Sequence, residues 1–508
     1  MSWAAGRFSA EDHPDGVVLE ADVIVIGSGA GGSAVALSLA EAGHRVAVLE
    51  AGRHWNPADF KPSTAFAFRH LYQANGARSA RGNTVMPLPG GRGVGGSTLI
   101  NSAICFRTPR PVLEDWRDRC GIDTIDPEAF GPIFDRLWTS LGVTVQSLEV
   151  QRLNNIVFRD GAEKLGLKGE FMERSAPGCV GCGICQYGCP TGGKSSVDRT
   201  LLVEGLATGN LEVHAGFSVE SVVERSGRIE AVTGVLLSRE TGKPIGTFTA
   251  KGRAFVLSGG PIGSPLFLLR NGLGNEHTGQ HLTVHPTVPG LASFPFEIKA
   301  WSGVTQGCYV DCWDEGFLLQ TYTTTPDQTY AVLPTAIGEA STKYMARLAH
   351  IGSAGTLVHD EDSHGHVRSS PVGPDIYYHL GEGDKQRLIR GLRRIGEIYF
   401  AAGAEVYLPA RVGGGEVRTM RDLERVLPLD LAPQYLQTYA SHPMGTCRMS
   451  ARPEDGVVDP LGRVWGLENF HVADASVFPT SLGVNPQITV MAMAMQIGTN
   501  LAGRLSST

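Results

Sequence analysis

The chain has 508 residues, of which 42% are hydrophobic, and it carries a formal net charge of -7. A chain of this length and composition can bury large cores and favours two closely joined domains, which excludes a small disulfide scaffold or a disordered tail. The acidic balance, without long basic runs, argues against nucleic acid and anionic membrane surfaces as partners.

Neither the start of the chain nor its charge-free stretches match a targeting or membrane segment. Residues 1–22 mix acidic and basic side chains, unlike a signal peptide, so a cytoplasmic location is expected. Residues 23–40 and 475–503 carry no charge, but the first stretch contains a glycine turn and the second contains Pro479, Asn485 and Pro486. Such residues would leave polar groups without partners in hydrocarbon. We expect both stretches to be buried beside a cofactor rather than to span a membrane.

The first predicted elements are a strand, a glycine turn, a helix and a second strand. The apolar run 21–26 predicts a strand, residues 30–42 have the composition of a helix that ends at Gly43, and residues 46–49 predict the second strand. This order predicts the start of a doubly wound, Rossmann-type parallel sheet in an α/β protein.

The glycine turn fits the pattern G-x-G-x-x-G at Gly27, Gly29 and Gly32. Bare backbone at these positions lets a pyrophosphate approach the N-terminus of the following helix. Glu50 ends the second strand, where a carboxylate would hold the ribose hydroxyls of a dinucleotide. An ordinary glycine turn with an incidental surface glutamate is the alternative interpretation.

The turn alone does not separate FAD from NAD. A second glycine nest at residues 90–98 includes Gly93, Gly96 and Ser97. It implies a second close approach of the backbone, as the far end of an elongated FAD would need. The two nests together favour FAD.

Four of the nine cysteines, Cys179, Cys182, Cys185 and Cys189, lie within eleven residues. Their spacing matches that of bacterial ferredoxins, in which thiolates on a tight loop surround an iron–sulfur cluster. Glycines between the thiols would let the chain curl around a cofactor. An iron–sulfur cluster is the first interpretation; reduced cysteines packed in a loop, a zinc site and disulfides are the alternatives.

The rest of the chain predicts a divided organisation. Strands are predicted at 211–213, 218–223, 232–237 and 254–258, and aromatic, threonine-rich pieces between 288 and 333, including 317–323, predict an antiparallel sheet. A helix that starts at Asp384 is expected to cover that sheet. We therefore expect a discontinuous FAD-binding domain, 1–287 and 440–508, with a cysteine-rich insertion at about 171–195, and a substrate-binding domain, 288–439.

The chain resembles the glucose-methanol-choline (GMC) oxidoreductase family nearly from end to end. The resemblance rests on segments spread along the chain: 22–29, 49–52, 95–101, 258–265, 442–449, 472–479 and 483–487. Some alcohol dehydrogenases and long-chain alcohol oxidases of the family also resemble the four-cysteine run. The resemblance implies FAD-dependent oxidation of an alcohol by hydride transfer to the flavin.

Residue by residue, the resemblance implies an active site and a set of cofactor contacts. His442 matches the active-site histidine, and Asn485 matches the second active-site position. The implied cofactor contacts outside the glycine nests are Glu50, Ala51, Asn101, Val219, Asp474 and Pro486. Some members link the flavin to a histidine where this chain has Ile100, so non-covalent FAD is expected.

An alcohol releases a hydride only as its hydroxyl proton leaves, so the reaction needs a base. A neutral His442 is predicted to accept that proton, because an ordinary imidazole has a pKa of about 6.5. Asn485 is predicted to donate a hydrogen bond to the same oxygen. His285 and Cys447 are interpreted as structural residues.

Four functions compete at this point. The first is an FAD alcohol dehydrogenase whose electrons leave through the cluster to a one-electron acceptor protein or a quinone. The others are an oxidase that uses oxygen and has structural cysteines, a lyase of the same fold, and an electron carrier without its own substrate. The predicted sheet around 317–323 offers aromatic and hydroxyl groups without a charged clamp, which favours a neutral apolar alcohol.

Overall fold

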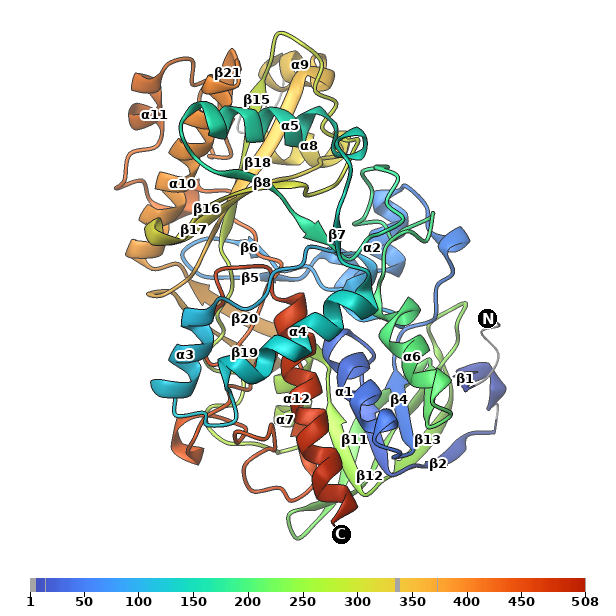
Figure 1. The fold of residues 1–508 in the computed structure, drawn as a ribbon. Coiled ribbons are helices and arrows are strands. Elements are labelled where there is room, and N and C mark those ends of the chain that lie inside the picture. The colour runs from blue at the N-terminus through green and yellow to red at the C-terminus, as the bar shows by residue number, and fades with distance from the viewer. Residues whose placement is uncertain (1–5, 14, 334–338, 372, 508) are drawn as a thin grey trace.

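The computed structural model describes residues 6–13, 15–333, 339–371 and 373–507. Its lower half in Figure 1 is built on a six-stranded parallel sheet with the order β1-β10-β4-β3-β14-β22. The strands are β1 (Arg7–Ser9), β10 (Leu211–Ala215), β4 (Val46–Glu50), β3 (Val23–Ile26), β14 (Ala254–Leu257) and β22 (Phe470–Val472). Strands β3, β4 and β14 are buried at every position, as strands covered on both faces require.

The strand order reverses beside β3. From β3 the chain continues outward through β4 to β10, whereas β14 and β22 lie on the other side of β3. In doubly wound sheets, ligands bind outside the carboxyl ends of the strands at such a switch point. The glycine turn follows β3 directly, so it lies at the position where a nucleotide is expected.

Helices and a second sheet cover the parallel sheet. Helix α1 (Ala30–Glu41), buried from Gly31 to Ala40, packs against α12 (Gln487–Ser506) and α6 (Leu201–Ala207). A four-stranded sheet joins β4 through its first strand, β11. Its strands are β11 (Phe217–Arg225), β12 (Arg228–Leu237), β13 (Pro244–Lys251) and β2 (Val17–Glu20).

The upper half in Figure 1 holds a six-stranded antiparallel sheet with the order β21-β15-β18-β17-β16-β8. Its strands are β21 (Val406–Pro409), β15 (Thr287–Ser293), β18 (Ile351–Val358), β17 (Phe317–Thr321), β16 (Cys308–Cys312) and β8 (Gly169–Phe171). Helix α10 (Glu382–Ala401) covers the sheet, with Leu388, Leu392, Ile395 and Tyr399 buried at the spacing that the sequence indicated. A parallel sheet joined to a helix-covered antiparallel sheet confirms the predicted fold class.

Two elements of the antiparallel half come from outside the range predicted for it, 288–439. Strand β8 pairs with β16 at the edge of the sheet, and helix α5 (Leu148–Lys164) packs against α10 and β16. The segment 148–171 therefore contributes to the substrate half, although the sequence pattern assigned it to the FAD-binding domain.

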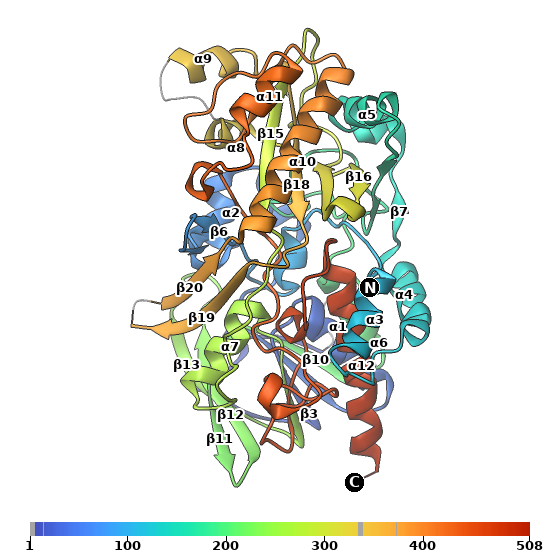
Figure 2. The ribbon, with the colours of Figure 1, turned by 90° about the vertical axis from the view of Figure 1, so that its left-hand side faces the viewer.

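The remaining elements connect the two halves and cover their surfaces. The hairpin of β19 and β20 projects beside α7 in Figure 2. These elements are β19 (His364–Ser370), β20 (Gly373–His379), α2 (Thr64–His70), α3 (Arg110–Asp118), α4 (Pro127–Leu141), α7 (Gly260–Arg270), α8 (Pro326–Val332), α9 (Glu339–Met345) and α11 (Met420–Val426), with the short pairs β5 (Ser79–Ala80) and β6 (Met86–Pro87), and β7 (Thr144–Val145) and β9 (Glu173–Arg174). Within the described ranges, no helix combines the length and apolarity needed to cross a membrane.

Candidate active site

A cavity of about 840 Å³ extends from the glycine turn after β3 to the antiparallel sheet. Gly27 and Glu50 line it on the side of the parallel sheet, and Gln320 and Tyr322 line it on the opposite side. This volume lies in the upper part of the range for ligand cavities, roughly 300–1,000 Å³.

The cavity gathers most of the residues predicted to bind the cofactor. Ten of the twelve line it: Gly27, Gly29, Glu50, Ala51, Gly96, Ser97, Asn101, Val219, Asp474 and Pro486. The other two lie behind the wall. A β-carbon on Gly32 would lie 1.9 Å from the carbonyl oxygen of Gly27, and one on Gly93 would lie 3.0 Å from the carbonyl oxygen of Arg53. Gly32 and Gly93 therefore let backbone segments pack closely and shape the wall from behind.

The wall at the nucleotide end fits FAD. A β-carbon on Gly31 would lie 2.0 Å from the carbonyl oxygen of Ala473, so this turn accepts only glycine. The carboxylate of Glu50 accepts hydrogen bonds from the backbone and the hydroxyl of Ser28, at 3.1 and 2.8 Å, and from the backbone of Gly52 at 2.8 Å. Burial raises the pKa of Glu50, and these donors oppose the shift. The acid is thus fixed at the switch point, as ribose recognition requires.

The part of the predicted cofactor region around Asp474 is also held in place by hydrogen bonds. Asp474 is buried and accepts hydrogen bonds from the backbone of Gly260 and Ser476, at 2.9 and 2.7 Å. Helix α12 begins at Gln487, immediately after Pro486, and both residues line the cavity. The positive end of its dipole therefore faces the cavity, where it stabilises negative charge.

The two predicted catalytic residues meet in this cavity. Nδ2 of Asn485 lies 3.5 Å from Nε2 of His442. The side-chain amide of Gln320 donates to Oδ1 of Asn485 at 2.6 Å, which turns the NH₂ group of Asn485 toward His442. Gln320 was not predicted from the sequence, although a polar residue within the buried strand β17 was the available signal.

His285, interpreted as structural from the sequence, contacts His442 directly. Its Nε2 accepts hydrogen bonds from the backbone of Leu482 and Gly483, at 3.2 and 2.9 Å, so its proton lies on Nδ1. That Nδ1 group lies 3.1 Å from Nδ1 of His442 and donates to it. The proton of neutral His442 then lies on Nε2, beside Asn485. An oxygen atom placed against both side chains would accept two hydrogen bonds.

This arrangement refines the predicted role of His442. To accept a proton at Nε2, His442 must take the tautomer with its proton on Nδ1, which gives up the hydrogen bond from His285. Losing a buried hydrogen bond costs about 1–3 kcal/mol. Burial lowers the pKa of His442 to about 4, so the ring is neutral at ordinary pH, as a base must be.

A pH dependence follows from this lowered pKa. The rate of flavin reduction by an alcohol is expected to be constant from about pH 6 to pH 9 and to fall as the pH approaches 4, because protonated His442 cannot accept a proton. Stopped-flow reduction measured under anaerobic conditions across this range tests the expectation. A rate that follows a group with a pKa near 6.5 would contradict it.

The four clustered cysteines do not form a metal-binding group in the structure. Among the described residues, no three or more histidine, cysteine, aspartate or glutamate side chains are placed to hold a metal ion, and the cysteines are free. Arg174 donates to the sulfur atoms of Cys179 and Cys185, at 3.5 and 3.4 Å, and the backbone of Lys194 donates to Cys189 at 3.3 Å. Three of the four predicted ligands thus accept hydrogen bonds from Arg174 or Lys194 in this structure.

The cysteine loop lies against the wall of the cavity. Nζ of Lys194, which is buried, donates to the carbonyl oxygens of Leu99 and Asn101, at 2.8 and 2.9 Å. The guanidinium of Arg174 also donates to the carbonyl oxygen of Ser102 at 2.8 Å. Asn101 and Ser102 line the cavity, so one layer of backbone separates the thiols from it.

The part of the cavity beside His442 is uncharged. Its described lining from the substrate half includes Gln320, Tyr322, Leu357 and Tyr439, and no Asp, Glu, Lys or Arg side chain among them. The charged residues Glu50, Arg78, Arg92 and Asp474 line the other parts of the cavity. A neutral ligand therefore suits the region near His442.

Comparisons with known proteins agree with this site. The GMC oxidoreductase N-terminal and C-terminal family models match residues 68–287 and 361–494, and an FAD binding domain model matches residues 22–62. An uncharacterized GMC-type oxidoreductase of Mycobacterium tuberculosis is 35% identical over 94% of this chain and 75% of its own length. A long-chain-alcohol oxidase of Arabidopsis thaliana is 30% identical over 98% of this chain and 68% of its own length.

Among solved structures, a formate oxidase of Aspergillus oryzae has the same fold. Its TM-score is 0.72 at 16% sequence identity, over 96% of this chain and 99% of the other. At this sequence identity the likeness shows a shared fold alone. The family models and the relatives, in contrast, show membership of a family. The chain belongs to the GMC oxidoreductase family and is an FAD-dependent enzyme that acts on CH–OH groups.

Proposed function

We propose that the chain oxidises an alcohol to a carbonyl compound, with the alcohol oxygen held by Nε2 of His442 and Nδ2 of Asn485. The observation that supports this role is the placement of these two nitrogens, 3.5 Å apart, at the wall of the cavity. Bound FAD supplies the hydride acceptor at its N5 atom. His442 takes the hydroxyl proton in its Nδ1–H tautomer, and Asn485 holds the oxygen as the carbonyl forms.

The proposed substrate is an apolar alcohol with a long chain. The described lining from the substrate half is uncharged, and it includes the side chains of Tyr322, Leu357 and Tyr439 beside several hydroxyl and amide groups. An apolar chain gains by leaving water for such a surface, whereas a charged substrate would lose its hydration without a partner. The name of the Arabidopsis relatives, long-chain-alcohol oxidase, agrees with this choice.

Anaerobic mixing with alcohols tests the proposal. A long-chain alcohol should bleach the flavin absorbance, whereas a charged alcohol of similar length should do so at least tenfold more slowly. A lyase or an electron carrier without its own substrate would leave the flavin oxidised with every alcohol. Readmission of oxygen then separates the two redox functions, because an oxidase restores the absorbance quickly and a dehydrogenase needs another acceptor.

The FAD is expected to be bound without a covalent link. The position that carries the histidine link in some relatives is Ile100, whose side chain cannot bond to the flavin. Denaturing the yellow protein should therefore release all of the flavin into the supernatant after acid precipitation. Flavin that remains with the precipitate would show a covalent link at another residue.

A second proposal concerns the four-cysteine loop. It assigns the chain to the branch of the family that has a ferredoxin-like four-cysteine run. We propose that it can hold an iron–sulfur cluster that removes electrons from the flavin one at a time. Gly181, Gly183 and Gly188 have φ of 70°, 74° and 89°, which lets the chain curl between the thiols. Burial alone would raise the pKa of Cys185, but the charges of Arg174 and Lys194 outweigh it and lower the pKa, which favours the thiolate that iron requires.

Replacing Cys182 by serine tests this electron path. The variant is expected to lose iron and turnover with an external one-electron acceptor, while an alcohol still bleaches its FAD once. Cys120→Ser is the matched control, because Cys120 is a free cysteine outside the run. Wild-type protein that contains no iron after anaerobic purification, or normal turnover by the Cys182 variant, would leave the cysteines with a structural role and favour the oxidase.

A further inference from the structure

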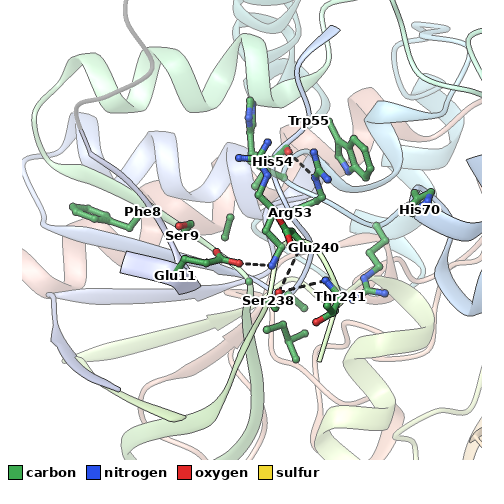
Figure 3. A pocket seen from close by; sticks show the side chains of 18 of the residues that line it. Phe8, Ser9, Glu11, Arg53, His54, Trp55, His70, Ser238, Glu240 and Thr241 are labelled. Carbon is green, nitrogen blue, oxygen red and sulfur yellow. Dashed lines mark hydrogen bonds between the residues drawn. The ribbon is translucent and has the colours of Figure 1, made fainter. Parts of the chain in front are cut away.

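A second cavity, of about 350 Å³, lies near the N-terminal strand β1 (Figure 3), and His442 is not among the residues that line it. Its wall comes from β1, from the segment after β4, from α2, and from the turn between β12 and β13. It shares Ala51, Arg92 and Leu237 with the wall of the active-site cavity at its nucleotide end. The proposed alcohol oxidation assigns no role to this cavity.

Five arginines line this small cavity, in a chain whose net charge is -7. Arg7 and Arg53 are partly buried, whereas Arg69, Arg92 and Arg239 are exposed at its mouth. The acidic residues in the lining are Glu11, Asp12 and Glu240. Positive charge therefore exceeds negative charge around the cavity.

The acidic side chains do not neutralise the arginines at the mouth. Glu11 accepts a hydrogen bond from the backbone of Arg239 at 2.5 Å, and Asp12 accepts one from the backbone of Ser9 at 2.7 Å. Arg53 lies 3.6 Å from Asp59. Among the described residues, Arg69, Arg92 and Arg239 have no carboxylate within ion-pair distance. Three guanidinium groups thus remain available to an anion.

The positive groups are close enough to repel one another. Burial lowers the pKa of Arg53, and repulsion by Arg239 lowers it further. Burial also lowers the pKa of His54 to about 4, with further lowering by Arg7 and Arg239. An anion in the cavity would replace this repulsion with attraction.

One wall of the cavity is aromatic. The guanidinium of Arg53 lies over the ring of Trp55, at 4.0 Å from its centroid (Figure 3). Trp55 is 4% exposed, and its indole N–H has no acceptor among the described residues. A flat surface and an unused hydrogen-bond donor therefore lie beside the arginines.

We propose that this cavity binds a small molecule that carries a phosphate or pyrophosphate group. Guanidinium groups match phosphate oxygens with paired, charge-assisted hydrogen bonds, which single ammonium groups cannot form. The volume of about 350 Å³ exceeds the needs of a bare ion and reaches the lower end of the range for organic ligands, roughly 300–1,000 Å³. A phosphate ester of mononucleotide size fits these features, with its ring against the Arg53–Trp55 wall.

Calorimetric titration of the FAD-loaded enzyme tests the proposal. The probes are AMP, inorganic pyrophosphate and citrate, so that a nucleotide, an inorganic phosphate and a polycarboxylate are compared. AMP and pyrophosphate are expected to bind, and more weakly at high salt. Arg69→Gln and Arg239→Gln should each weaken binding by roughly tenfold or more. Arg421→Gln, an exposed arginine on α11, is the matched control and should leave the affinity unchanged.

Each outcome decides the proposal. Tighter binding of AMP than of pyrophosphate supports a nucleotide ester, and equal binding supports an inorganic phosphate as the source. Absence of AMP and pyrophosphate binding to the FAD-loaded enzyme overturns the proposal. Unchanged affinity in both pocket variants also overturns it, as does citrate that binds more tightly than either phosphate.

Discussion

Replacing His442 by alanine is expected to lower the rate of flavin reduction by roughly a hundredfold or more while FAD stays bound, the usual scale for the loss of a general base. His442 offers its Nε2 to the alcohol oxygen, and Asn485 alone cannot accept the hydroxyl proton. Anaerobic stopped-flow reduction by a long-chain alcohol measures the rate, and the flavin spectrum before mixing reports FAD content.

His364→Ala serves as the matched control for this experiment. His364 is exposed on β19, outside the lining of the cavity, and should leave the rate unchanged. Reduction of the His442 variant at the normal rate would remove His442 from the mechanism. A variant that loses FAD would instead assign His442 a role in the cavity wall, which the spectrum distinguishes from the loss of a base.

Replacing Gly32 by alanine is expected to abolish FAD binding, although Gly32 does not line the cavity. The new β-carbon would lie 1.9 Å from the carbonyl oxygen of Gly27 and 2.9 Å from its carbon, so the turn after β3 must move. Because that turn forms the nucleotide end of the cavity, its displacement removes the close approach of backbone on which FAD depends. Purified variant protein should be colourless.

Gly263→Ala tests whether any added methyl group near the nucleotide has this effect. Gly263 lies in α7, in the turn and helix that follow β14, and a β-carbon there meets no atom within 4 Å. This variant should keep its FAD and should be slightly more stable, since alanine favours a helix over glycine by about 1 kcal/mol. A yellow Gly32 variant with normal affinity for FAD would contradict the steric argument.

The cofactor half could be predicted because its signals are local in sequence. The glycine turn, Glu50 and the second nest each depend on backbone geometry within a few residues, and the fold brings Gly27, Glu50 and Ser97 to one cavity. Parallel strands buried on both faces also leave a clear apolar pattern. The division of the chain between the two halves was harder to predict, because the sequences of α5 and β8 show no pattern that assigns them to the antiparallel sheet.

The hydrogen bonds of the active site could not be predicted in the same way. Gln320 and Asn485 are separated by 165 residues, and His285 and His442 by 157, so no local pattern connects them. The cysteine spacing predicted a compact loop, but it did not reveal that the buried Arg174 would donate to two of the thiols. Such contacts depend on the packing of distant segments rather than on a motif.

The contribution of β8 and α5 to the antiparallel sheet limits how the protein can be divided. A fragment cut at residues 288–439 would lose β8, which pairs with β16 from Cys308 to Val310, and α5, which packs against α10. The freed edge of β16 would present unpaired backbone groups, and the uncovered side of α10 would present apolar side chains to water. Exposed edges of this kind pair with other chains. The substrate half is therefore completed by a segment that lies between β4 and β10 in the sequence. Excising residues 288–439 alone would favour aggregation.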